Sequence, residues 1–116
     1  MDPLTLIPDA ATMVLPTAVP KPTSRSGQRE ATHVAWSDGP VRAGVWECDR
    51  GEFTTSRDGL HEVCHVLRGV GRLTADDGTV SELTPGTTVV IPDGWSGVWQ
   101  IDEDMRKTFV IVTTRS

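Results

Sequence analysis

The sequence predicts one all-β domain of the antiparallel barrel or sandwich type. Three observations support this: short runs of β-forming residues recur from residue 31 onward, turn-forming residues separate them at regular intervals, and no window shows the 3.6-residue apolar period of a helix. A chain of 116 residues fits a single domain and can bury one core without disulfides or a structural metal.

The expected strands follow one another closely along the chain. Asp-Gly pairs, which favour tight turns and hairpins, fall at 38–39, 58–59, 77–78 and 93–94. Such even spacing is typical of an antiparallel barrel or sandwich. The predicted strands cover residues 32–36, 41–48, 52–57, 61–67, 71–75, 79–83, 87–91, 96–101 and 107–113.

The N-terminal quarter of the chain differs from the rest. Residues 1–30 contain prolines at positions 3, 8, 16, 20 and 22, and proline at this density opposes both helix and central strand. We therefore expect an extended arm over residues 1–30 and a barrel over 31–116. Two interpretations of the arm stay open: it packs on a partner subunit, or it is a partly disordered tail.

Composition excludes several classes of function. The net charge is −5 and the 11 Lys and Arg residues are scattered, which argues against nucleic-acid binding. No apolar run reaches the roughly 18 residues of a membrane span, and the first residues lack the basic start of a secretory signal. We expect a cytoplasmic protein with two free thiols, Cys48 and Cys64.

Two stretches resemble the conserved motifs of cupins. "GTTVVIPDGWSGVW" has the frame G-x5-P-x-G of the second cupin motif, and "EVCHVLRGVGRLT" resembles the second half of the first. The segments "AGVWECDRGEF" and "MRKTFVI" resemble the small cupins grouped with the cupin domain of (S)-ureidoglycine aminohydrolase. The matching motif residues are Gly86, Pro92 and Gly94 in the second motif, and Glu62 and Gly69 in the first.

This resemblance implies an RmlC-like jelly-roll barrel (a double-stranded β-helix), usually a homodimer, with an N-terminal arm that often crosses the partner. It also implies a metal held by three histidines and a glutamate. Here the segment that would supply two histidines reads Thr-Ser-Arg-Asp at 55–58, and the third position is Gly97. Because Glu62 alone remains, we expect no standard metal site. A divalent metal such as manganese is the disfavoured alternative.

The stretch "GLHEVCHVLRG" carries residues of metal-ligand type, but its spacing does not suit one ion. Side chains alternate faces along a strand, so His61 and His65 share one face and stand about 13 Å apart at 3.3 Å per residue. A common ion needs Zn–N bonds near 2.0–2.1 Å. The histidines are expected to be structural or surface residues that point away from the cavity.

The opposite face of this strand carries the candidate site. Since the resemblance places Glu62 inside, Cys64 also faces inward. Glu62 is either a structural acid held by Arg57, Lys107 or a Trp N–H, or a functional group. As a functional group it would be a catalytic acid/base with a raised pKa or one ligand of an unusual metal site. Cys64 is expected to be a small core residue rather than a nucleophile.

Tryptophans complete the expected pocket. If Gly97 faces inward, the alternation of side chains along the strand turns Trp99 inward as well. Trp46 is expected to lie on a strand of the same sheet system as Trp99 and to line the cavity with it. Two rings near one carboxylate suit a small polar or cationic ligand, although rings that merely fill the barrel remain an alternative. Trp95 is expected at the barrel mouth or a dimer contact, and Gly97 should leave room in the cavity. The expected ligand-binding residues are Glu62, Cys64, Trp46, Trp99, Arg57 and Lys107.

Three functions follow from these residues, and whether the protein is an enzyme stays open. The first is a small-molecule-binding cupin without the standard metal site. The second, implied by the resemblance alone, is a metal-dependent aminohydrolase acting on a ureido or amino acid substrate. The third is an assembly or regulatory subunit whose barrel is packed solid.

Overall fold

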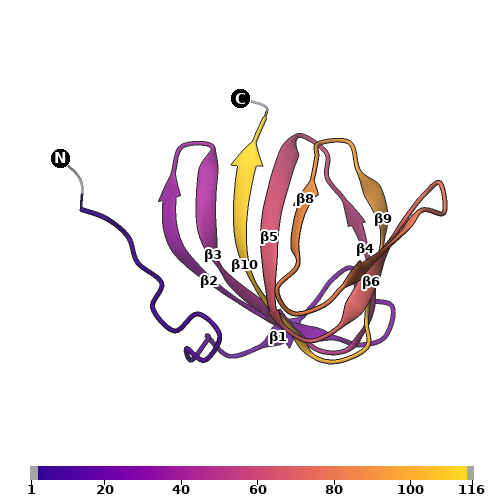
Figure 1. Cartoon of the computed structure of the whole chain (residues 1–116), viewed down its shortest axis with the longest axis horizontal. Helices are drawn as coiled ribbons and strands as arrows, with labels where there is room; N and C mark the ends of the chain where they lie inside the picture. The colour runs from indigo at the N-terminus through magenta and orange to yellow at the C-terminus, as the bar shows by residue number, and fades with distance from the viewer. Residues whose placement is uncertain (1–2, 115–116) are drawn as a thin grey trace.

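The computed structural model of the protein describes residues 3–114 and shows ten antiparallel strands across this range. Figure 1 shows them curling into a barrel, with the N-terminal segment leading away from it on the side of β2. The strands are β1 (Val19–Pro20), β2 (Arg29–Asp38), β3 (Val41–Cys48), β4 (Gly51–Ser56), β5 (Leu60–Arg68), β6 (Gly71–Ala75), β7 (Val80–Leu83), β8 (Thr88–Ile91), β9 (Ser96–Ile101) and β10 (Met105–Thr113).

The described strands form two sheets that face each other. One has the order β1-β2-β3-β10-β5-β8 and the other β4-β9-β6-β7. Neighbours far apart in sequence, such as β3 and β10, lie side by side, which is the crossed connectivity of a jelly roll. The all-β prediction is confirmed, and each expected strand is present within three residues of its predicted ends. The short edge strand β1, which contains Pro20, was not predicted.

The boundary between arm and barrel lies earlier than residue 30. Strand β1 pairs with β2, and β2 itself begins at Arg29. Gln28 is buried, donates from Nε2 to the Asp49 carbonyl at 2.8 Å, and accepts a hydrogen bond from Ser24 at 2.8 Å. These bonds fix residues 19–30 to the barrel, so the extended segment ends near residue 18. Residues 1–2 and 115–116 of the expected ranges lie outside the described residues.

One arginine attaches the extended segment to its own barrel. The Arg106 guanidinium is buried, and its Nη1 donates to the carbonyls of Ala10 and Met13 at 3.1 and 2.7 Å. Its Nη2 donates to Glu47 at 3.3 Å. The segment is therefore held to the barrel through its backbone. Leu4, by contrast, is 89% exposed.

The core lies between the sheets. Trp99, on β9, is buried there as predicted. Trp46 was expected in the same sheet system, but it lies on β3, which belongs to the opposite sheet. The Trp46 and Trp99 rings meet edge to face, with centroids 6.1 Å apart, and Phe53 stacks on Trp99 at 5.6 Å. This aromatic contact across the sheets closes one side of the barrel interior.

The turn glycines of the second motif have a conformational reason. Gly86 and Gly94 have φ values of 95° and 94°, in a region that side-chain-bearing residues rarely adopt. Their spacing around β8 sets where that strand begins and where the chain turns toward β9. Among residues 3–114, no helix long and apolar enough to cross a bilayer is present.

Candidate functional site

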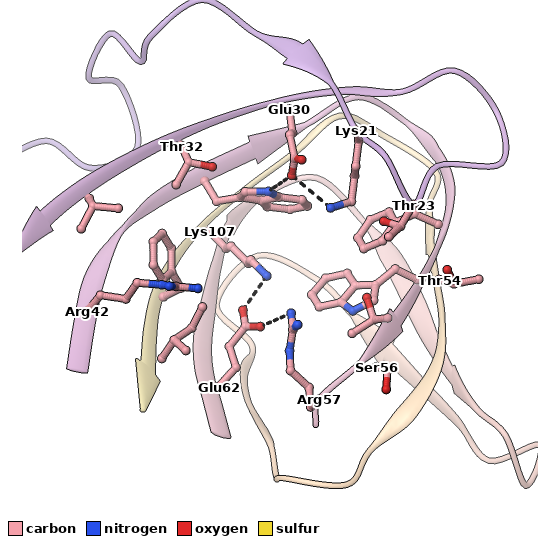
Figure 2. A pocket seen from close by; sticks show the side chains of 17 residues that line it. Lys21, Thr23, Glu30, Thr32, Arg42, Thr54, Ser56, Arg57, Glu62 and Lys107 are labelled. Atoms are coloured by element: carbon pink, nitrogen blue, oxygen red, sulfur yellow. Dashed lines mark hydrogen bonds and ion pairs between the residues drawn. The ribbon is translucent and has the colours of Figure 1, made fainter. Parts of the chain in front are cut away.

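A cavity of about 410 Å³ lies between the two sheets and is partly open to solvent. The barrel is therefore not packed solid, while the assembly or regulatory role that was expected of a solid barrel stays a prediction. Figure 2 shows that charged and hydroxyl side chains from β2, β3, β4, β5 and β10 converge on this space. The lining residues are Lys21, Thr23, Glu30, Thr32, Val34, Arg42, Trp46, Phe53, Thr54, Thr55, Ser56, Arg57, Glu62, Trp99, Lys107, Phe109 and Ile111.

Glu62 lies at the centre of the site. Strict alternation along β5 buries it, leaving the residue 1% exposed. Lys107 on β10 donates from Nζ to Oε2 at 2.7 Å, and Arg57, just after β4, donates from Nη2 to Oε1 at 2.5 Å. Both contacts appear as dashed lines in Figure 2. Each carboxylate oxygen is thus paired with a cation of the protein itself.

These cations determine the protonation state of the acid. Burial raises the pKa of Glu62, but the charges of Lys107 and Arg57 and their hydrogen bonds outweigh it and hold that pKa below its ordinary value. The expectation of a raised pKa is wrong. At neutral pH Glu62 is a carboxylate with no proton to give, which does not suit a general acid.

The ammonium group of Lys107 also fills the space between the aromatic rings. It lies 4.4 Å from the centroid of the Trp46 ring and 4.3 Å from that of Trp99. A cation at this position is attracted by both ring faces. Since the protein supplies that cation, the aromatic pair beside Glu62 is not free for a cationic ligand, and that expectation is wrong.

A second ion pair comes from residues that the sequence analysis did not select. Lys21 donates to Glu30 Oε1 at 3.0 Å, and Trp46 Nε1 donates to the same oxygen at 2.9 Å. Lys21 also lies 4.3 Å from the centroid of the Phe53 ring. Both charged residues were assigned to the arm. Extending the alternation of β2 back to residue 30 would have turned Glu30 inward with Thr32.

Arg42 is the cation at the edge of this arrangement. In the six-stranded sheet, Ile111 pairs with Arg42 on one side and with Glu62 on the other. The Cα atoms of Arg42 and Glu62 are therefore two strand spacings, about 10 Å, apart. Figure 2 shows the Arg42 side chain reaching toward the interior. Within residues 3–114, no ion pair or side-chain hydrogen bond engages its guanidinium.

Two buried donors in the cavity wall lack acceptors within the described chain. They are Nε1–H of Trp99, a residue 1% exposed, and Nε–H of Arg57. Burying such a group without a partner costs about 1–3 kcal/mol.

The thiols are not part of the cavity. Cys64 is buried beside Glu62, and burial raises its pKa to about 11. Burial likewise raises the pKa of Cys48 to about 12. Cys64 was predicted as a ligand-binding residue, but it is absent from the described residues that line the cavity. Both thiols stay protonated and serve as small core residues.

The histidines of β5 point away from the cavity, as their alternation predicts. His61 Nδ1 accepts a hydrogen bond from the Asp93 backbone N–H at 2.8 Å. His65 Nδ1 lies 2.8 Å from the Thr88 hydroxyl. They stabilise neighbouring segments on the outside of the barrel and do not face Glu62.

The donor set does not fit the metal that the fold implies. At Gly97, a Cβ would stand 2.3 Å from the Thr74 carbonyl oxygen and 2.7 Å from the Trp95 ring. The Trp95 ring packs against the core and takes the room that Gly97 was expected to leave. Nowhere in residues 3–114 do three His, Cys, Asp or Glu side chains gather as a metal site would require. Glu62 already binds two cations of the chain.

Comparison with known proteins supports the fold and the family. The EutQ protein of Clostridium difficile superposes with a TM-score of 0.70 at 16% identity, over 84% of this chain and 78% of that one. The putative ethanolamine utilization protein Q of Salmonella typhimurium LT2 gives 0.69 at 17%, over 97% and 94%. A DUF861 family protein from Thermotoga maritima gives 0.53 at 29%, over 56% and 73%.

No curated protein sequence matches the chain. The family profile described as "EutQ-like cupin domain" matches residues 36–109, which cover β3 to most of β10 and 11 of the 17 described residues that line the cavity. The jelly-roll barrel predicted from the cupin motifs is therefore confirmed, and the chain belongs to the EutQ-like cupin domain family.

Proposed function

We propose that this protein binds a small polar molecule in its barrel without a metal ion. The observation that carries the proposal is the pairing of Glu62 with Lys107 and Arg57 inside a cavity of about 410 Å³. The pairing neutralises the acid that a metal would otherwise need. The cavity keeps room and hydrogen-bonding groups for a ligand.

Metal analysis and a ligand screen on metal-stripped protein test this proposal. The protein is treated with EDTA and screened by thermal shift against small polar compounds. A hit should bind equally well before and after the treatment. Binding that depends on stoichiometric manganese, or the absence of any ligand, would contradict the proposal.

A pair of matched variants locates the ligand. Thr32 lines the cavity from the inner face of β2, where it pairs with Trp46, whereas Val80 on β7 is 53% exposed and not part of the lining. Thr32→Trp should abolish binding of a hit by filling the cavity, and Val80→Trp should leave it unchanged. Equal binding by both variants would place the ligand elsewhere.

The alternative is a metal-dependent aminohydrolase acting on a ureido or amino acid substrate. It is supported by the resemblance of residues 43–53 and 105–111 to the ureidoglycine aminohydrolase cupins. Such chemistry needs a firmly held Lewis acid. Release of ammonia from ureidoglycine by manganese-loaded protein, absent after EDTA treatment, would favour this alternative over ligand binding alone.

We also propose that the protein is a homodimer that pairs through the outer face of its six-stranded sheet. An apolar row crosses this face: Trp36 pairs with Ala43, Ala43 with Val110, Val110 with Val63, and Val63 with Val90. Their exposures reach 63% at Val90 and 42% at Trp36. Continuous apolar patches of this kind are typical of association surfaces.

Light scattering with a charged substitution tests the dimer. Val110→Lys, in the middle of the row, should give a monomer. Val80→Lys is the control, because Val80 is 53% exposed on β7 of the other sheet. A monomeric parent protein, or a dimer that survives Val110→Lys, would rule this surface out.

A cytoplasmic location is part of the same proposal. It is supported by Cys48 and Cys64, which are both free thiols, as expected in a reducing compartment. Fractionation of the native host with an antibody to the protein would test it, and recovery outside the cytoplasm would contradict it.

A further inference from the structure

We infer that the ligand of this cavity is a small organic anion, namely a carboxylate carried on a flat apolar body. This inference rests on the proposed ligand-binding function and adds the chemical class of the ligand. Three features carry it: the balance of charge around the cavity, the donors of Arg42 that lack acceptors, and the apolar part of the wall.

The first feature is an excess of positive charge. Of the described lining residues, Lys21, Arg42, Arg57 and Lys107 are cationic, while Glu30 and Glu62 are anionic. Glu30 is paired with Lys21, and Glu62 is shared between Lys107 and Arg57. The cavity is left with two uncompensated positive charges in a chain whose net charge is −5. A bound monoanion would reduce this imbalance.

The second feature is the set of donors without acceptors. The guanidinium of Arg42 reaches toward the cavity and has no ion pair or side-chain hydrogen bond within residues 3–114. A carboxylate offers two oxygens and about four lone-pair sites, and it has no proton to donate. It therefore matches a wall rich in donors better than a neutral amide or an amine does.

The third feature separates an organic anion from an inorganic one. Trp46, Phe53, Trp99 and Phe109 line the cavity together with the charges. Aromatic rings pack well against a flat apolar group and poorly against a fully hydrated ion such as phosphate. Lys107 and Lys21 already lie over Phe53, Trp46 and Trp99. An apolar group would therefore pack against Phe109, Val34 and Ile111, which also line the cavity.

Calorimetric titration with probes of one shape and three charges tests the inference. Metal-stripped full-length protein is titrated with benzoate, benzamide and benzylamine, with inorganic phosphate as the anion that lacks an apolar body. Benzoate should bind at least about tenfold more tightly than benzamide, the size of effect expected of hydrogen bonds to a charged group. Its affinity should fall as salt is added. Benzylamine and phosphate should not bind measurably.

Matched arginine variants locate the effect. Arg42→Gln should weaken benzoate about tenfold and leave benzamide unchanged, because the neutral probe gains little from the guanidinium. Arg29→Gln is the control: Arg29 is exposed on β2, pairs with Asp49, and does not line the cavity. Neither residue is buried, so both variants should fold.

The outcomes separate this inference from the proposed function. If benzamide or benzylamine binds as tightly as benzoate, the inference fails and the proposed ligand-binding function stands. If phosphate binds as tightly as benzoate, the organic part of the inference fails. If none of the four probes binds, the inference fails, and the proposed function is decided by the thermal-shift screen against small polar compounds. Loss of benzoate affinity equal in Arg42→Gln and Arg29→Gln would also overturn the assignment to this cavity.

Discussion

The two faces of β5 carry similar side chains in very different surroundings. Glu62 faces inward, where the residue is 1% exposed and paired with two cations. His61 and His65 face outward, where each ring makes one hydrogen bond with a neighbouring segment. Polar side chains one residue apart thus belong to separate environments, and only the inward one takes part in the cavity.

The difference shows how a strand divides a motif. Four potential metal ligands occur within five residues of β5, yet alternation sends them to opposite sides of the sheet. Inside, low solvent exposure makes each unpaired charge expensive, so Glu62 requires Lys107 and Arg57. Outside, water screens the histidines and little depends on them. The predictions below test this contrast.

The largest effect is expected for Glu62→Gln. Removing this carboxylate leaves Lys107 and Arg57 as unpaired charges in the barrel, which should destabilise the protein by about 3–5 kcal/mol. Glu52→Gln is the control, since Glu52 pairs with Arg25 at the exposed surface, and should cost at most about 1 kcal/mol. Urea denaturation at pH 7 measures both. Equal losses would show that the interior pairs contribute no more than a surface pair.

Restoring the motif histidine at Gly97 should also destabilise the protein. A Cβ there conflicts with the Thr74 carbonyl and the Trp95 ring. Gly97→His should therefore cost about 3 kcal/mol, the upper range for overpacking, and gain no manganese. Gly97→Ala should lose nearly as much, because the conflict begins at Cβ. Denaturation and metal analysis decide the outcome, and a stable Gly97→His variant that holds metal would contradict it.

Acid should weaken the interior pairs. The folded pKa of Glu62 lies below its ordinary value of 4.5. Its pairs therefore stabilise fully above about pH 4.5, and that contribution disappears as pH falls through the lower folded value. The gap in unfolding free energy between the parent protein and Glu62→Gln should narrow by about 1.4 kcal/mol for each unit of pKa shift. A gap independent of pH between 2 and 7 would contradict this.

The smallest effects are expected on the outer face. His61→Ala and His65→Ala should each cost about 1 kcal/mol or less, the value of one exposed hydrogen bond. Added zinc should not raise the melting temperature through either residue. Thermal shift with and without zinc measures this, and stabilisation by zinc that either variant abolishes would show that the outward face binds metal after all.

Much of the fold could be predicted because it depends on local patterns. The turns at Asp-Gly pairs and the runs of β-forming residues located nine strands. Once the cupin resemblance had placed Glu62 and Gly97 inside, alternation correctly turned Trp99 inward and His61 outward. The missing strand β1 is two residues long and contains Pro20, so it has almost no local signal. Its register with β2 is a matter of tertiary packing.

The site could be predicted only in part. Arg57 and Lys107 were among the partners considered for Glu62, and the structure brings all three together. Lys21 and Glu30 were missed because their role depends on how the Pro-rich segment folds back over the aromatic rings. No pattern in residues 19–30 reports a contact with Phe53 on β4.

By itself, the sequence determined the class of fold and which residues of β5 share a side, because turn chemistry and strand alternation act over a few residues. Its resemblance to cupins added which side faces inward and which ligand histidines are absent. The tertiary structure alone decided that Lys107 lies between Trp46 and Trp99, that Glu62 stays charged, and that Trp95 fills the space beside Gly97. These depend on pairings between strands far apart in the chain. The energy of a buried charge is set by such distant neighbours and not by its position in the sequence.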